Sequence, residues 1–353
     1  MFSVYHIILY ILLLLSVIVK RRSANQFLLV CGVLLVIFCT LRNPSLYNDL
    51  VGYEEYFRRG ELPNTAEGSF NIGYITLNNI VKYLTGSFTV LLGVVATIII
   101  TCYCKFFKYY SPYPVFSLAL YFMVGFIFSL SGLRQALSVS TGLIFFHYLL
   151  KDNAKFCFVW LLISISLHTT AVILIPIWFL YRIPLSKFTI FIMIGGMVSV
   201  TLLMRTVGSL FLGLSEYYMK YIDMEAEGAL ERTLMKVFIL IVFIYALREK
   251  IFEKNINYLL LLCLAFNVII YVGGSSFFGI FRLRTYFEIC EIVGIPVILY
   301  HVNYIAKQRR FLSYLGVFVY LVLLFLSFYR LINSNSIMTT PVYSTIFTKS
   351  TAL

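Results

Sequence analysis

Charged side chains inside apolar stretches are the first candidates for chemistry in this sequence, because a buried charge is costly. Arg134 follows Ser131-Gly132-Leu133 and precedes Gln135, between two apolar runs with almost no loop. A guanidinium binds phosphate oxygens through two parallel hydrogen bonds. We therefore interpret Arg134 as an anion-binding residue. The structural alternative is an arginine at a helix end that extends to water.

A second pair of arginines, Arg282 and Arg284, precedes the aromatic residues Tyr286 and Phe287. Glu288 lies four residues after Arg284, so the two side chains could pair on one face of a helix. Such a pair would neutralise only one of the two arginines. We expect at least one of them to bind phosphate.

His168 lies in the polar centre of the otherwise apolar segment 156–181. An imidazole at that position could act as a general base or as a hydrogen-bond donor. The structural alternative is a buried histidine that is bonded to Ser164 or to another side chain.

Asp49 is followed by Tyr53 and Tyr56 at spacings of four and three residues. A helix would place these side chains together. A carboxylate beside aromatic rings is typical of a sugar-binding site, and Asp49 is a second candidate for the base. An ordinary solvated acidic loop is the alternative.

The sequence contains no histidine, cysteine or aspartate motif with metal-ligand spacing and no phosphate-binding loop for nucleotides. The seven cysteines lie almost entirely in apolar runs, and we expect buried structural thiols. We predict neither a metal nor a cofactor. An enzyme of this kind would use a substrate that is already activated and attached to a lipid.

The elements that must position these residues are membrane helices, since 61% of residues are hydrophobic and only 12% are charged. Soluble domains carry roughly twice that charged fraction. A crossing needs about 20 apolar residues. We predict an all-α polytopic membrane protein, residues 1–353 as one domain with about 11–12 transmembrane or re-entrant helices. The predicted spans are 2–19, 25–41, 88–104, 115–131, 134–150, 188–207, 233–247, 256–272, 286–302 and 311–330.

The segment 156–181 either crosses once as a tilted helix or folds back at His168. The cluster at 20–22 follows the first span and is expected in the cytoplasm, where such loops collect basic residues. This rule explains the net charge of +13 without a nucleic-acid partner. We favour the fold-back, which brings the candidate residues to one external face: Asp49, Arg134, His168, Arg282 and Arg284.

The largest extramembrane feature is an external loop at about 42–87. Apolar residues at 77, 80, 81 and 84 have the spacing of a helix with one apolar face. We interpret this helix as lying on the outer leaflet. A second loop covers about 208–232, and residues 333–353 form a polar tail.

The order of these motifs resembles the EpsG-type family of bacterial membrane proteins, which is related in role to the Wzy O-antigen and capsule polymerases. The similarity spans about residues 40–300. The residues that carry it are Arg42, Asp49, Tyr53, Gly132-Leu133-Arg134-Gln135, Leu167-His168-Thr169-Thr170-Ala171, Arg282 to Phe287, and a following helix with Pro296.

The resemblance implies a GT-C-like glycosyltransferase of the bacterial inner membrane, active at the periplasmic face. It would transfer a growing polysaccharide from undecaprenyl pyrophosphate to a new lipid-linked repeat unit. Its partners would be these lipid-linked oligosaccharides, the bilayer and a chain-length regulator protein. The implied roles are pyrophosphate binding by Arg134 with Arg282 or Arg284, proton abstraction by His168 or Asp49, and sugar binding by Gln135, Tyr53, Tyr56 and Tyr286.

Two other functions are compatible with many helices and a basic site. A flippase or transporter of the same lipid-linked oligosaccharide would more often show two similar halves, which this sequence does not. A membrane acyltransferase that modifies surface sugars could use His168 as its base.

Overall fold

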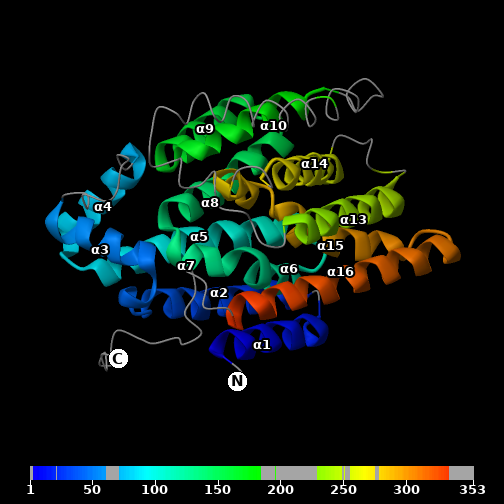
Figure 1. Ribbon diagram of the computed structural model, residues 1–353, viewed down its shortest axis with the longest axis horizontal. Coiled ribbons are helices and arrows are strands. Elements are labelled where there is room, and N and C mark those ends of the chain that lie inside the picture. Colours follow the sequence, from blue (N-terminus) through cyan, green and yellow to red (C-terminus); the bar gives the residue numbers. More distant parts are fainter. Residues whose placement is uncertain are drawn as a thin grey trace. The chain divides into compact units, whose positions relative to one another are not determined.

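The computed structural model describes residues 3–20, 22–60, 71–183, 195, 229–248, 250, 255–274 and 278–333. Over these residues the chain is helical and contains no β-strand, which confirms the predicted all-α class (Figure 1). The predicted span 188–207, the loop 208–232 and the tail 333–353 lie mostly outside the described residues.

Within the described part, three helical segments are long and apolar enough to cross a membrane: Phe88–Tyr110, Pro114–Ser131 and Lys307–Asn333. Six shorter apolar helices accompany them: Val4–Ile18, Ala24–Thr40, Ala154–Leu167, Thr169–Leu180, Ile256–Val272 and Ile289–Val302. The protein is therefore a helical membrane protein. The number of crossings and the GT-C-like arrangement stay predictions.

Contacts divide the chain into two compact units, Met1–Val172 with Leu324–Leu353, and Ile173–Leu323. The first contains α1 (Val4–Ile18), α2 (Ala24–Thr40), η1 (Pro44–Leu46), α3 (Asn48–Arg59), α4 (Ile72–Thr85), α5 (Phe88–Tyr110), α6 (Pro114–Tyr121), η2 (Phe122–Phe126), α7 (Ile127–Ser131), α8 (Leu133–Leu150), α9 (Ala154–Leu167) and most of η3 (Thr169–Ile173). The second contains α10 (Leu174–Leu180), α13 (Ala229–Leu247), α14 (Ile256–Gly274), η4 (Phe278–Tyr286) and α15 (Ile289–Val302). Helix α16 (Lys307–Asn333) passes from the second into the first.

In the first unit, α5 packs against α2, α6 and α8, and α8 packs along α9. The predicted external loop contains two helices, α3 and α4. Both end at a glycine in the left-handed conformation, Gly60 (φ 78°) and Gly86 (φ 62°). Glycine adopts this conformation at low cost and so terminates each helix. Helix α4 includes the predicted apolar positions 77, 80, 81 and 84, and its position on a leaflet stays a prediction.

The apolar run 114–131 is not a uniform α-helix, because residues Phe122–Phe126 form a π-helical turn. The run ends at Gly132 (φ −81°, ψ 64°), and α8 begins at the next residue. This break places Arg134 in the first turn of α8, between two apolar helices as the sequence indicated.

The segment 156–181 is interrupted at its polar centre. Helix α9 ends at Leu167, and His168 has an extended backbone (φ −157°, ψ 123°). A short 3-10 turn and α10 follow. The polar residues therefore stop the α-helix. Because α10 belongs to the second unit, the choice between one crossing and a fold-back stays a prediction.

In the second unit, α14 packs against α10, α13, η4 and α15, and α13 also packs against α15. Tyr258 of α14 donates to the carbonyls of Leu180 and Ile183 at 3.1 and 2.9 Å, which ties α14 to the end of α10. These contacts place α14 at the centre of its unit.

We predict that Gly73→Ala separates α4 from α9. A Cβ atom at position 73 would lie 2.8 Å from the carbonyl oxygen of Ser166, closer than real Cβ contacts. Since backbone atoms cannot rotate away, we expect a loss of about 1–3 kcal/mol, typical of overpacking. The measurement is the melting temperature of the purified protein in detergent.

Gly52→Ala in α3 is the matched control, because a Cβ there meets nothing within 4 Å. Alanine favours a helix over glycine by about 1 kcal/mol, so this control should be neutral or stabilising. Equal melting temperatures for Gly73→Ala and the wild type would contradict the tight contact between α4 and α9.

Candidate functional site

The centre of the candidate site is the contact between Arg134 of α8 and Tyr53 of α3. The Nε of Arg134 donates to the Tyr53 hydroxyl at 3.2 Å. The guanidinium carbon lies 5.7 Å from the centre of the same ring, within range of a cation–π interaction. Arg134 is half-buried, whereas Tyr53 is 7% exposed. The phenol thus holds the guanidinium of a side chain that is only half-buried.

A second tyrosine supports this contact from α4. The rings of Tyr53 and Tyr74 lie 5.4 Å apart, and Tyr74 is fully buried. Burial raises the pKa of both phenols, and the positive charge of Arg134 opposes that rise. Both tyrosines therefore keep their protons at neutral pH, and Tyr53 meets Arg134 as a neutral hydrogen-bond partner.

His168 lies at the same end of the α8–α9 helix pair as Arg134, because of the register in which the two helices pack. The Ser138 hydroxyl donates to the carbonyl of Ser164 at 2.7 Å, and the hydroxyls of Thr141 and Ser164 lie 2.9 Å apart. The two helices run antiparallel after a short turn. Arg134 lies four residues before Ser138 and His168 four residues after Ser164. Each is therefore about 6 Å beyond the contact, at one end of the pair.

The imidazole of His168 is held by its own chain. Its Nδ1 lies 2.6 Å from the Thr170 hydroxyl and 3.4 Å from the Thr170 amide nitrogen. The His168 amide donates to the carbonyl of Ser164 at 3.0 Å. The side chain is half-buried. These contacts with Thr170 and Ser164 hold the imidazole ring in one orientation.

The other candidates of the first unit differ in exposure. Asp49 lies one turn before Tyr53 on α3 and is exposed, and its charge contributes to the raised pKa of Tyr53. The predicted helical grouping of Asp49, Tyr53 and Tyr56 is present. Tyr56 and Gln135 are buried, at 9% and 4% exposure. Their contact with a sugar stays a prediction.

The arginines of η4 belong to the second unit. Arg284 donates to the Tyr271 hydroxyl at 3.1 Å and pairs with Glu288 at 3.3 Å. The pairing of Arg284 with Glu288, which the sequence suggested as the structural alternative, is thus present. Arg282 is exposed, and Tyr286 is buried. That these arginines share a ligand with Arg134 stays a prediction.

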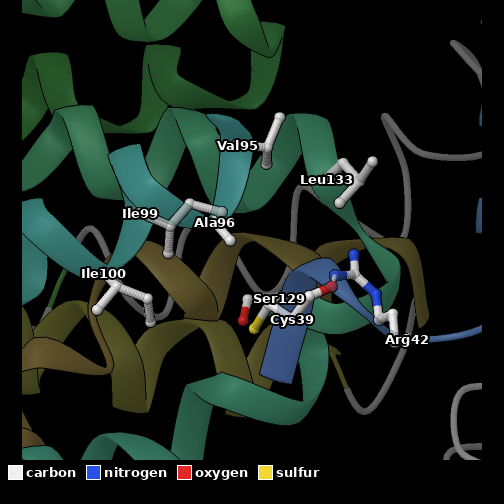
Figure 2. Close-up of a pocket in the computed structure, with 8 residues that line it drawn as sticks. All are labelled: Cys39, Arg42, Val95, Ala96, Ile99, Ile100, Ser129 and Leu133. Carbon is white, nitrogen blue, oxygen red and sulfur yellow. Dashed lines mark hydrogen bonds between the residues drawn. The ribbon is translucent and has the colours of Figure 1, made fainter. Parts of the chain in front are cut away.

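A small cavity lies beneath the start of α8 (Figure 2). Its volume of about 10 Å³ is at the lower limit for a cavity that can hold one water molecule. It is lined by Cys39, Arg42, Val95, Ala96, Ile99, Ile100, Ser129 and Leu133. Arg42 is 1% exposed, and its guanidinium donates to the carbonyl of Cys39.

The sequence predicted no separate role for Arg42 in the site. Arg42 begins the predicted external loop 42–87 and directly follows the predicted span 25–41. A cation at the end of an apolar span is the signal that could have identified it. Tyr74 was also missed, since one more tyrosine among 27 gives no distinguishing signal.

Comparison with known proteins decides the family. The model of the EpsG family matches residues 25–343, which is most of the chain. The chain belongs to the EpsG family. No curated protein and no solved structure matches it. The resemblance inferred from the order of the motifs is thereby confirmed.

EpsG-family membership makes this a membrane protein of the polysaccharide-polymerase type, a type associated with glycosyltransferase activity. The matched range includes every candidate site residue and begins after α1. In the described part of this EpsG-family chain, no three His, Cys, Asp or Glu side chains gather as metal ligands would. Of the seven cysteines, five are buried and two are half-buried.

We predict an energetic coupling between Tyr53 and Arg134. Tyr53→Phe keeps the ring and removes the hydroxyl that accepts from Arg134. Hydrogen bonds to charged groups contribute about 1.5–3 kcal/mol. We expect Tyr53→Phe to lower the free energy of unfolding clearly in the wild type and much less in Arg134→Met. Denaturation of the four purified proteins in mixed micelles measures both values.

Tyr83→Phe is the control, because Tyr83 is 90% exposed on α4 and its hydroxyl should contribute little. Strictly additive effects of Tyr53→Phe and Arg134→Met would show that the two side chains do not stabilise each other.

Proposed function

We propose that this protein is a membrane glycosyltransferase that polymerises lipid-linked oligosaccharide repeat units of a bacterial surface polysaccharide. The donor is a chain on undecaprenyl pyrophosphate, and the acceptor is a new lipid-linked repeat unit. The observation that carries the proposal is the placement of Arg134, held by Tyr53, at the same end of α8 and α9 as His168. It supplies a cation and a proton acceptor to one site.

The reaction places negative charge on the leaving group. The acceptor hydroxyl attacks the anomeric carbon, the bond from that carbon to the pyrophosphate oxygen breaks, and the pyrophosphate leaves with the electron pair. A guanidinium fixed beforehand stabilises this developing charge without reorganisation. Arg134 is fixed by its hydrogen bond and ring contact with Tyr53. In this proposal Arg282 or Arg284 supplies a second cation.

The proton of the acceptor hydroxyl passes to His168. In this proposal Thr170 orients the imidazole for this transfer: its hydroxyl lies 2.6 Å from Nδ1, and its amide N–H donates to the same nitrogen at 3.4 Å. A histidine held in this way can accept a proton near neutral pH. Asp49 is the alternative base, because it is an exposed carboxylate one turn from Tyr53.

In this proposal four side chains would contact sugars: Tyr53, Tyr56 and Gln135, with Tyr286 of the second unit.

Helix α4 exposes apolar side chains beside a buried face that contains Tyr74. An exposed apolar face of this kind favours a helix that lies on a membrane surface, as the sequence predicted. The exposed apolar residues of α4 are Ile72, Ile80, Tyr83 and Leu84.

The distribution of lysines supports an external active face. The Tyr110 hydroxyl lies 2.8 Å from Nδ1 of His147, so the C-terminal ends of α5 and α8 meet. Exposed lysines lie at this end: Lys105, Lys108, Lys151 and Lys155. Arg134 is at the other end of α8, about 25 Å away by the helix rise. Since lysines gather on the cytoplasmic side, the site would face outward, in the periplasm.

Two alternatives use the same features. A flippase would bind the lipid-linked oligosaccharide through Arg134 without breaking a bond. An acyltransferase would use His168 on a sugar hydroxyl, with an acyl donor from the cytoplasm. The lysine distribution supports an outward-facing His168, and an outward-facing base would favour chemistry on an exported acceptor. The polymer length distinguishes all three functions.

We predict that Arg134→Ala converts a ladder of surface polysaccharide into single repeat units. The variant replaces the native gene, and the polysaccharide is separated on a gel. Loss of one stabilising donor in a preorganised site lowers rates by roughly 10²–10³-fold. Membrane abundance is measured in parallel. Arg58→Ala is the matched control, since Arg58 is exposed and paired with Glu54 on α3.

Each outcome assigns a function. An unchanged ladder in Arg134→Ala at normal abundance would remove Arg134 from the site. Deletion of the gene also separates the alternatives. Loss of a polymerase leaves single units, loss of a flippase leaves none, and loss of an acyltransferase leaves full-length chains.

We predict that Thr170→Val slows polymerisation through His168. The variant removes the hydroxyl that orients the imidazole. His168→Gln should lose roughly 10²–10⁴-fold in rate, the usual contribution of a general base. Thr170→Val should lose less, because the ring remains. Initial rates with purified protein and lipid-linked repeat units give these values.

Thr169→Val is the matched control, since Thr169 is adjacent and exposed. A fully active His168→Gln together with an inactive Asp49→Asn would assign the base to Asp49 instead.

A further inference from the structure

The second unit contains a cluster of buried charges that the proposed reaction does not use. Lys236 of α13 lies 2.6 and 2.7 Å from the two carboxylate oxygens of Glu291 on α15. Tyr320 of α16 donates to the same carboxylate, and Asn267 of α14 donates to it at 3.0 Å. Glu291, Asn267 and Tyr320 are fully buried, and Lys236 is 6% exposed. Charges at this depth are costly and need a reason.

One residue connects this cluster to the arginine of η4. Lys236 lies 5.3 Å from the centre of the Tyr271 ring, and the Tyr271 hydroxyl accepts from Arg284 at 3.1 Å. The guanidinium carbon of Arg284 is also 5.8 Å from that ring. Tyr271 therefore has a lysine near its face and an arginine at its hydroxyl.

The two buried carboxylates have different cationic partners. Glu291 pairs with Lys236, and Glu288 pairs with Arg284. Without Lys236, Glu291 would be a second carboxylate near Arg284 and would neutralise it further. The side chain of Arg284 is 29% exposed, whereas that of Glu288 is 7% exposed. Part of the Arg284 side chain thus remains accessible, whereas Glu288 lies inside.

We propose that Tyr271 is a positioning residue that holds Arg284 as a pyrophosphate-binding guanidinium, with Lys236, Glu291 and Tyr320 fixing the helices around it. The inference rests on the proposed function, because it assigns Arg284 a pyrophosphate ligand. A fixed guanidinium binds the anion with less loss of side-chain freedom. The cluster supplies this rigidity from four helices, α13, α14, α15 and α16.

The test measures binding rather than polymerisation. Purified full-length protein in nanodiscs is titrated with undecaprenyl pyrophosphate, and the Kd is determined for the wild type, Tyr271→Phe, Arg284→Met and the double variant. Tyr271→Phe removes only the hydroxyl and should weaken binding about tenfold, the effect of one hydrogen bond to a charge. The double variant should bind no more weakly than Arg284→Met, because Tyr271 acts only through Arg284.

Tyr258→Phe is the matched control. Tyr258 is a buried tyrosine of the same helix whose hydroxyl bonds only to backbone carbonyls of Leu180 and Ile183 in the described region. Its loss should leave the Kd unchanged. Melting temperatures check the fold of each variant. If the Tyr271→Phe protein does not accumulate in the membrane, Tyr271→Met takes its place. Arg284→Lys likewise replaces Arg284→Met.

Three results would overturn the inference: an unchanged Kd in folded Tyr271→Phe, losses that multiply in the double variant, or no binding by the wild type. Failure of the proposed function has a different signature. A wild-type protein that binds undecaprenyl pyrophosphate with the expected coupling, yet forms no polymer from lipid-linked units, would refute the polymerase and keep the role of Tyr271.

Discussion

The cost of removing charge from water is the constraint on which this structure depends. Three cations in the described part of the chain lie beside specific polar partners. Arg134 has the hydroxyl of Tyr53, Lys236 has both oxygens of Glu291, and Arg284 has Tyr271 and Glu288. Phenols recur in these contacts because a tyrosine is largely apolar and carries one hydrogen-bonding group. This helps to explain a chain with 27 tyrosines.

The described partners of the cations differ in charge between the two units. In the first unit, Arg134 donates to the neutral phenol of Tyr53. In the second unit, Glu291 pairs with Lys236 and Glu288 pairs with Arg284. A neutral partner orients a cation without reducing its charge, whereas a carboxylate also offsets part of that charge.

Much of the architecture could be predicted from hydrophobicity alone. The spans at 25–41, 134–150 and 256–272 correspond closely to α2, α8 and α14. The interruption at His168 followed from its polar neighbours. The partners of the cations could not be predicted, because they come from distant helices. Tyr53 is 81 residues from Arg134, and Lys236 is 55 residues from Glu291. A single sequence shows that a charge lies in an apolar segment, but it does not show which distant residue pairs with that charge.

The break at Gly132 has an electrostatic consequence of its own. The amides in the first turn of a helix point along its axis, and their aligned dipoles give that end a partial positive charge. Because α8 starts immediately after Gly132, this end coincides with Arg134. Attraction of an anion at this position therefore has a backbone component that no side-chain substitution removes. The glycine that separates α7 from α8 thus also gives this position an electrostatic field that is independent of the arginine side chain.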